Sequence, residues 1–361
     1  MLERRTMLEC QGPVGAKERL TKWWHGEAVE GVAWAIHALR KEPRFEPPPT
    51  PEGRDWTQRW TDPAIRIPQF LRQFAAVEYL GEAIPYLDTQ IGPGSFGLFL
   101  GVEPVFAPDT VWYEPTLKDL AEGPGLSFDP DNHWFRVHVE YIQAALAVAE
   151  GRFYVSLPDL VEGLDTLAAL YNNQKLLVDL MDRPELVHAT QARLTDLYFE
   201  VYDRLYEMVK DEAGACCFSA FQTWAPGRYA KVQCDIAAAL GPGQFEEFVA
   251  PYLARQCERL DYAMFHLDGP DCIRHLDILL QVPGLQVIQW TPGAGQPDVG
   301  DPVWYGMYRR ILERKRLILL GMPLERAKPT VEAIGTRGVY MVTGGCGVDE
   351  GLRALEASRG W

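Results

Sequence analysis

The sequence predicts an α/β protein built as a (β/α)8 barrel, and three observations lead to this prediction. Eight short segments rich in β-branched and aromatic residues are spread over the 361 residues, and most end near Gly, Pro or Asp. Amphipathic segments with helical spacing lie between them, an alternation typical of parallel strands joined by helices. GPGSFG at 92–97 lacks the G-x-G-x-x-G spacing of a phosphate-binding turn, which disfavours an open doubly wound sheet.

The predicted strands, in chain order, are 31–39, 83–90, 152–159, 215–221, 262–268, 285–290, 316–323 and 339–345. Residues 1–30 are predicted to form a helical N-terminal extension, and the first half carries long loops such as the Pro-rich stretch 42–53. In 160–182, leucines recur near the helical period, which predicts a long helical region. No composition change splits the chain, so 1–361 is predicted to be a single barrel domain.

Composition limits the possible functions. With 50 acidic and 35 basic residues the net charge is −15, which opposes binding to the phosphates of nucleic acids. No apolar run approaches the roughly 18 residues of a membrane span, and the start, MLERRTMLECQGP, lacks the apolar centre of a signal peptide. Seven scattered cysteines do not make a disulfide framework. We therefore expect a cytoplasmic protein with no membrane and no nucleic-acid partner.

Ligand-type side chains at predicted strand ends indicate a metal site. His266 and Asp268 share one face of their strand by alternation, and Cys346 lies in the GGCG turn that ends the last strand. Imidazole, carboxylate and thiolate are the usual ligands of zinc, and strand carboxyl ends meet at one mouth of a barrel. Cys234 and Asp235 follow the fourth predicted strand and compete for the remaining position. The preferred set is His266, Asp268 and Cys346, with Cys234 next; alternatively, Asp268 caps the following helix.

Other residues near the strand ends are candidates for contacts with a substrate. They are Tyr86, Asp88, Asp159, Gln222, Trp224, Asp235, Gln289 and Trp290. Trp224 and Trp290 would suit the wall of a pocket for an amphipathic ligand, because their rings combine an apolar face with a polar tip. The alternative for both is packing inside the barrel.

Several motifs resemble the uroporphyrinogen decarboxylase superfamily. HLDG at 266–269, QFEEFVAPY at 244–252 and GGCG at 344–347 carry the resemblance, which covers residues 80–361. The match is closer to the zinc-dependent methyltransferases that act with corrinoid proteins. In that branch a His-x-Cys pair and a Cys in the last turn hold the metal, so His266 and Cys346 match and Asp268 stands in place of the first Cys.

The resemblance implies an enzyme that moves a methyl group between a corrinoid protein and a small molecule, with Zn²⁺ as cofactor. A D-x-H-x-x-G corrinoid motif is absent, since DNHWFR at 131–136 lacks the glycine, so the methylcorrinoid is expected on a separate protein. The decarboxylase branch has a His in place of Cys346 and an Arg-rich amino-terminal motif that this chain lacks. The alternatives are a metal-independent decarboxylase or lyase of the same superfamily and a non-catalytic binding barrel.

Overall fold

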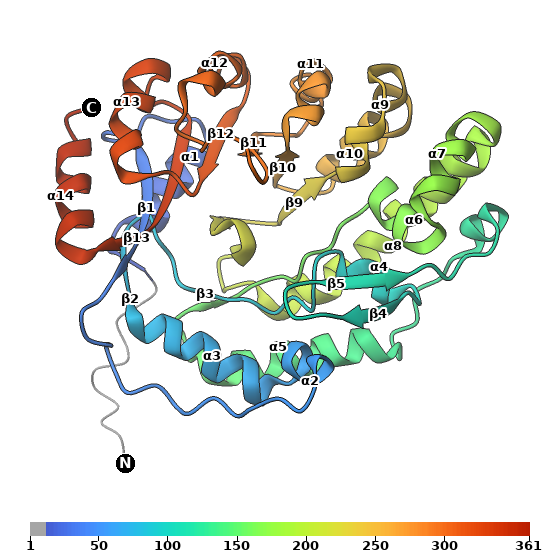
Figure 1. The fold of residues 1–361 in the computed structure, drawn as a ribbon, viewed down its shortest axis with the longest axis horizontal. Helices are drawn as coiled ribbons and strands as arrows, with labels where there is room; N and C mark the ends of the chain where they lie inside the picture. Colours follow the sequence, from blue (N-terminus) through green and yellow to red (C-terminus); the bar gives the residue numbers. More distant parts are fainter. Residues whose placement is uncertain (1–11) are drawn as a thin grey trace.

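The computed structural model describes residues 12–361, and its centre is a seven-stranded sheet (Figure 1). The strands lie in the order β2 (Val77–Gly81), β1 (Ala33–Leu39), β13 (Val339–Gly347), β12 (Arg316–Leu320), β11 (Val287–Thr291), β10 (Tyr262–Asp268) and β9 (Tyr229–Gln233). All neighbours are parallel except β1 and β2, which are antiparallel. The predicted α/β class with parallel strands is confirmed.

Shorter strands extend this arrangement. They are the parallel pair β3 (Tyr86–Leu87) and β6 (Tyr154–Val155), and the hairpins β4 (Glu103–Phe106) with β5 (Val111–Glu114) and β7 (Cys216–Phe218) with β8 (Thr223–Ala225). The backbone N–H of Leu157 donates to the carbonyl of Cys217 at 3.3 Å, which joins the β6 and β7 segments. Within residues 12–361 the ladders form no complete ring, so the architecture is compatible with a TIM-like barrel without a continuous circle of paired strands.

Each of the eight predicted strand segments overlaps a strand, but β2, β4, β5 and β8 were not predicted, and neither was β9. Its sequence, YAKVQ, places Lys231 and Gln233 on one face, so the segment lacks the apolar run that identified the other strands. The tertiary structure stabilises it nevertheless, because β9 pairs with β10 from Tyr229 to Gln233. The missed strand lies directly beside the predicted ligand His266, which pairs with Gln233 in register.

Helices surround the strands, and Figure 1 shows α11, α12 and α13 on the outer side of the second-half strands. The α-helices are α1 (Ala16–Trp24), α2 (Trp56–Thr61), α3 (Pro63–Ala76), α4 (Ser95–Phe99), α5 (His133–Ala149), α6 (Leu164–Tyr171), α7 (Asn173–Asp182), α8 (Pro184–Val209), α9 (Pro242–Phe248), α10 (Ala250–Glu258), α11 (Leu276–Leu279), α12 (Tyr305–Leu312), α13 (Leu324–Ile334) and α14 (Val348–Ser358). The 3-10 helices are η1 (Leu120–Gly125), η2 (Ser219–Phe221), η3 (Asp235–Ala239), η4 (Pro270–His275) and η5 (Pro302–Trp304). No helix within the described range is long and apolar enough to cross a membrane.

Helix α1 packs against the amino-terminal ends of the strands. Trp24 is buried there, its indole N–H donates to the carbonyl of Trp224 at 2.7 Å, and its ring contacts those of Tyr229 and Tyr262, which begin β9 and β10. This is the helix found in the predicted N-terminal extension, of which residues 1–11 lie outside the described range. Helix α1 therefore covers the end of these strands opposite to their carboxyl-terminal ends.

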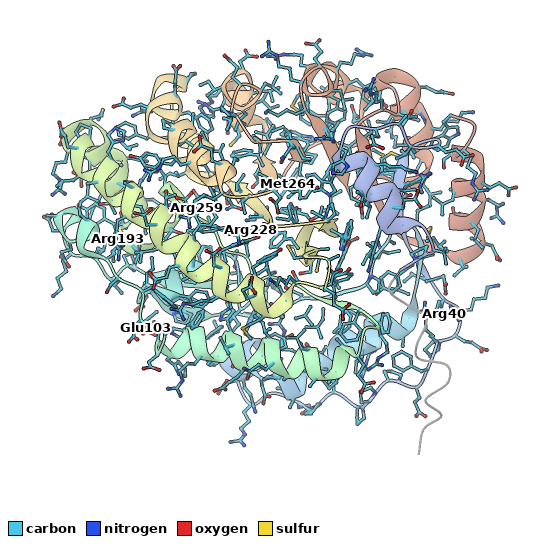
Figure 2. The ribbon with its side chains drawn as sticks, turned by 180° about the vertical axis from the view of Figure 1, so that it is seen from behind. Arg40, Glu103, Arg193, Arg228, Arg259 and Met264 are labelled. Carbon is cyan, nitrogen blue, oxygen red and sulfur yellow. The ribbon has the colours of Figure 1, made fainter. Side chains whose placement is uncertain are left out.

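Long helices close the back of the molecule, seen in Figure 2. In α8, Leu194, Leu197, Tyr198 and Val201 are buried at three- and four-residue spacing, the pattern of a helix with one apolar face. Arg228, labelled in Figure 2, pairs with Asp203 of α8 and so ties the segment before β9 to this helix.

Candidate active site at the strand ends

The carboxyl-terminal ends of β9, β10 and β11 carry a row of polar side chains. In the parallel register Gln233, His266 and Gln289 are paired with one another across the three strands, and Asp268 is paired with Thr291. Alternation places His266 and Asp268 on the same face of β10, as the sequence predicted. The sheet thus concentrates hydrogen-bonding and ligating groups at one edge.

Three potential metal ligands meet at this edge. Asp235, His266 and Asp268 each offer one ligand atom, and these atoms all lie within 4.8 Å of one another. Asp235 begins η3, directly after β9, and its backbone N–H donates to the Asp165 carboxylate at 2.7 Å. The N–H of Ile236 donates to the same carboxylate at 3.0 Å. Asp165 of α6 therefore fixes the turn that brings Asp235 to the strand edge.

The hydrogen bonds of Gln289 determine which nitrogen of His266 is free to bind a metal. Gln289 is buried, and its Nε2 donates to the Trp290 carbonyl at 2.7 Å and to the Thr291 hydroxyl at 3.0 Å. These contacts orient the amide so that Oε1, which lies 2.5 Å from His266 Nδ1, is the acceptor. Nδ1 therefore carries the proton, and the lone pair on Nε2 remains available to a metal.

The group carries an excess of negative charge. Asp159, Asp165, Asp235 and Asp268 supply four carboxylates, and the basic residue Lys231 opposes their effect on Asp235. Burial, followed by repulsion from Asp165, raises the pKa of Asp235 to about 7. A bound divalent cation would compensate this charge and favour the ionised carboxylates.

A buried ion pair lies next to the ligands. Lys231 Nζ is 2.6 Å from an Asp159 carboxylate oxygen, and both side chains are almost completely buried. Burial, followed by repulsion from Lys231, lowers the pKa of His266, so the imidazole is favoured in its neutral, ligating form. Asp159, predicted as a substrate contact, is thus a partner of Lys231.

The three donors suit zinc chemically. Zinc accepts imidazole nitrogen and carboxylate oxygen, and a tetrahedral ion with bonds of about 2.1 Å separates its donors by roughly 3.4 Å. Donor atoms within 4.8 Å of one another reach that spacing through modest side-chain movement. Asp268 is not the cap of the following 3-10 helix, because Gly269 occupies the cap position. Three protein ligands also leave a fourth position for a substrate.

Cys346 does not join this group. The register between β1 and β13 shifts after His37 pairs with Gly344, since Leu39 pairs with Gly347, so β13 contains one extra residue. Such a bulge reverses the alternation of side chains. The Cys346 thiol accordingly points toward α14, since a Cβ atom added to Gly351 of that helix would lie 3.5 Å from Sγ. Burial raises the pKa of this thiol. The sequence treated the strand as regular and therefore expected Cys346 beside His266.

Cys234 also lies outside the group. It is buried between Gln233 and Asp235, and alternation gives it the opposite face from these two neighbours. Burial, followed by repulsion from Asp165 and Asp235, raises the pKa of its thiol well above the ordinary value. Asp235, and not Cys234, offers the third ligand atom of the group.

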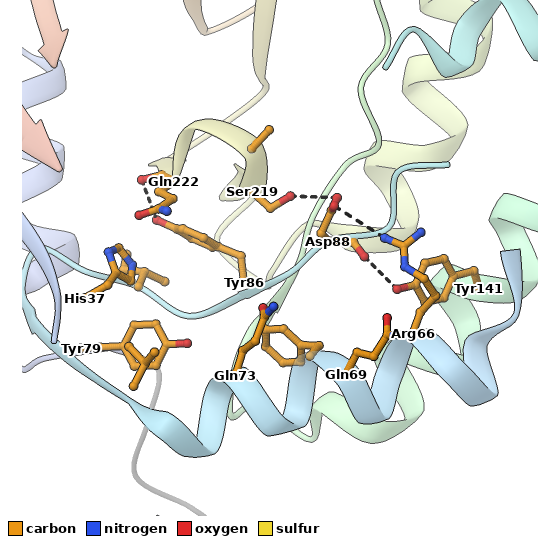
Figure 3. A pocket seen from close by; sticks show the side chains of 14 residues that line it. His37, Arg66, Gln69, Gln73, Tyr79, Tyr86, Asp88, Tyr141, Ser219 and Gln222 are labelled. Atoms are coloured by element: carbon orange, nitrogen blue, oxygen red, sulfur yellow. Dashed lines mark hydrogen bonds and ion pairs between the residues drawn. The ribbon is translucent and has the colours of Figure 1, made fainter. Parts of the chain in front are cut away.

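Three of the predicted substrate contacts line a separate cavity of about 440 Å³, shown in Figure 3. They are Tyr86, Asp88 and Gln222, and they face Arg66 and other residues on one side of α3. Asp88 is 3.6 Å from Arg66 and accepts a hydrogen bond from the Ser219 hydroxyl at 3.0 Å.

The two predicted aromatic wall residues do not line this cavity. Trp290 is fully buried and packs on Trp304, with 5.0 Å between ring centroids. Trp224 is buried at the other end of the strands, beside Trp24. Both occupy the packing positions that were the alternative in the sequence analysis.

Sequence reasoning missed two charged residues of these sites. Lys231 lies on β9, which was not predicted. A lysine in the middle of a short segment such as YAKVQ is unusual in a buried strand, and this could have marked it as a candidate site residue. Arg66 lies on α3, where Arg66, Phe70 and Gln73 recur at helical spacing after the N-cap Asp62. Neither residue follows a predicted strand, which was the criterion for selection.

Comparison with known proteins finds a similarity in structure but none in sequence. No family model and no curated protein matches the sequence. The fold is similar to that of a methyltransferase from Methanosarcina mazei, with a TM-score of 0.59 and 16% sequence identity over 96% of this chain and 98% of that one. At this identity the similarity establishes a shared fold.

Proposed function

We propose that this protein is a zinc-dependent methyltransferase that moves a methyl group between a separate corrinoid protein and a small molecule. The observation that carries the proposal is the meeting of Asp235, His266 and Asp268 at the strand ends, with His266 held in its metal-binding tautomer. The shared fold with a solved methyltransferase supports the reaction class, and the sequence motifs HLDG and GGCG support the corrinoid-linked branch.

In this proposal Asp235, His266 and Asp268 hold the zinc ion. The ion would act as a Lewis acid that lowers the pKa of a bound acceptor group and so makes it a better nucleophile for a methyl group. Gln289 keeps His266 oriented, and Asp165 keeps Asp235 in place through the backbone N–H groups. The chain's own contribution is to position the ligand atoms and to favour the neutral, ligating form of His266.

The choice of ligands bears on the kind of acceptor. Two carboxylates and one imidazole donate less electron density than the thiolate ligands of the family that the motifs resemble. A zinc ion held by Asp235, His266 and Asp268 is therefore more electrophilic. Such an ion activates weakly acidic groups such as hydroxyls more strongly, so we propose an acceptor or donor other than a simple thiol.

The second candidate is a metal-independent lyase or decarboxylase. It is favoured by one observation, the buried Lys231–Asp159 pair beside Asp235, because an ammonium and carboxylates in one site suit acid–base chemistry. The two candidates differ in their dependence on metal.

Methyl transfer to free cob(I)alamin, followed through its visible absorption, tests the proposal. Methylated small molecules are offered to the full chain, and the formation of methylcobalamin is compared before chelation, after chelation and after zinc is restored. The proposal predicts transfer that chelation abolishes and zinc restores, and that His266→Ala lacks. The lyase would be favoured by the absence of methyl transfer in every zinc-loaded sample. It would also be favoured by a decarboxylation of the substrate whose rate chelation does not change.

A further inference from the structure

We propose that the 440 Å³ cavity beside α3 binds the small-molecule substrate, and that this substrate is an uncharged molecule with several hydroxyl groups. The assignment to the reaction rests on the proposed function, whereas the ligand class follows from the cavity's own residues. A cavity of 440 Å³ lies within the range of small-molecule sites, about 300–1,000 Å³.

One face of a helix forms a wall of the cavity. Arg66, Gln69, Phe70 and Gln73 occupy positions i, i+3, i+4 and i+7 of α3, so their side chains project to the same side. Figure 3 shows the labelled members of this row facing Tyr86 and Asp88 across the cavity. The wall therefore carries both polar and aromatic groups.

The charges in the cavity are already paired. Arg66 donates to the carbonyls of Trp60 and Gln90, at 2.7 and 2.8 Å, and its guanidinium lies 3.6 Å from Asp88. His37 contributes no charge at neutral pH, because burial lowers its pKa to about 4. A charged ligand would lose water without gaining an unpaired opposite charge, which is costly. An uncharged ligand avoids this cost.

Carboxamides supply the groups that would recognise hydroxyls. Gln69 and Gln73 are exposed to the cavity and make no side-chain hydrogen bond to another residue of 12–361, and the buried Oε1 of Gln222 also lacks a partner there. A carboxamide both donates and accepts, and so does a hydroxyl, so the two match in either direction. The rings of Phe70 and Tyr86 add apolar faces for the carbon skeleton between hydroxyls.

A shared wall connects the cavity with the candidate metal ligands. The segment Ser219–Phe221 lines the cavity through Ser219 and Ala220, while the Phe221 ring lies 4.6 Å from that of His266. Gln222, which follows, has a left-handed φ of 53°, and the hydroxyls of Tyr86 and Tyr340 donate to its carbonyl at 3.3 and 3.1 Å. These bonds hold a conformation that is otherwise unfavourable for a non-Gly residue.

Ligand-observed saturation-transfer NMR on the full chain tests the inference with three probes of one shape. Methyl β-glucoside is uncharged, methyl β-glucuronide has a carboxylate in place of one hydroxymethyl group, and the 6-amino analogue has an ammonium there. The test variant is the double substitution Gln69→Ala/Gln73→Ala. The matched control is Gln281→Ala, because Gln281 is also an exposed glutamine but does not line the cavity. Zinc-free and zinc-loaded samples are both measured.

The inference predicts saturation of the uncharged probe alone, in both samples. The double variant should weaken its binding roughly tenfold, since two hydrogen bonds are lost, and Gln281→Ala should leave it unchanged. Equal or tighter binding of a charged probe, unchanged binding by the double variant, or no binding of any probe would overturn the inference. Binding of the uncharged probe by a chain that transfers no methyl group would refute the proposed function alone.

Discussion

Replacing Gln289 by Leu should weaken zinc binding without removing any ligand. The substitution keeps the side-chain size but removes the acceptor 2.5 Å from His266 Nδ1, so the proton is no longer held on that nitrogen. Loss of such an orienting partner typically lowers metal affinity by about 10- to 100-fold. This corresponds to about 1.4–2.7 kcal/mol of binding free energy. Gln289→Glu, which keeps an acceptor, should bind zinc more tightly than Gln289→Leu.

Titration of the zinc-free chain against a chromophoric zinc chelator measures this affinity. Circular dichroism shows whether each variant is folded, because Gln289→Leu also removes the hydrogen bond to the Trp290 carbonyl. Gln281→Leu is the control for an exposed glutamine. Zinc affinity within twofold of wild type in folded Gln289→Leu would refute the assignment of the His266 tautomer.

Three further predictions concern charge and ligand identity. Burial raises the pKa of Glu162 to about 7 from the ordinary 4.5, so the folded chain retains a proton that the unfolded chain loses. Through this group the free energy of unfolding in urea should fall by roughly 3 kcal/mol as pH rises from about 4.5 to 7. Glu162→Gln should make the fall smaller than in wild type by about that amount, and identical profiles for the two chains would contradict the prediction. Lys231→Met leaves the Asp159 carboxylate buried and unpaired, so it should cost about 3–5 kcal/mol in urea unfolding. The double variant Lys231→Met/Asp159→Asn should recover most of that loss. A double variant that loses as much free energy of unfolding as the two single variants together would argue against a coupled pair. Cys346→Ala should retain zinc by elemental analysis and His266→Ala should lose it; the reverse would restore the thiol as a ligand.

Much of the fold and two of the three residues of the metal group could be predicted from the sequence. Segments such as 262–268 and 285–290 combine β-branched or aromatic residues with alternation, so they identify both the strands and the inward faces. His266 and Asp268 follow from alternation within a single strand, which needs no knowledge of neighbouring elements. Gln289 is found in the same way and proves to be the partner of His266.

The remaining parts depend on tertiary structure. Strand β9 has inward polar residues, so the signal that identifies a buried strand is missing, and Lys231 is missed with it. The bulge in β13 inserts one residue near Gly345, whose φ is +83°, and no periodicity reveals that Cys346 changes sides. Asp165 looks like a helix-start residue and does lie in the first turn of α6, yet its carboxylate accepts hydrogen bonds from backbone N–H groups about 70 residues further along the chain.

The central claim is that Asp235, His266 and Asp268 hold a zinc ion. Elemental analysis of the chain, purified without chelators or a histidine tag, tests it most directly when wild type is compared with Asp235→Asn. The account predicts about one zinc per chain in wild type and a largely empty site in the variant, because a neutral amide is a much weaker zinc donor than a carboxylate. A wild-type chain that stays metal-free after reconstitution with zinc, or an Asp235→Asn chain that keeps a full equivalent, would contradict the account.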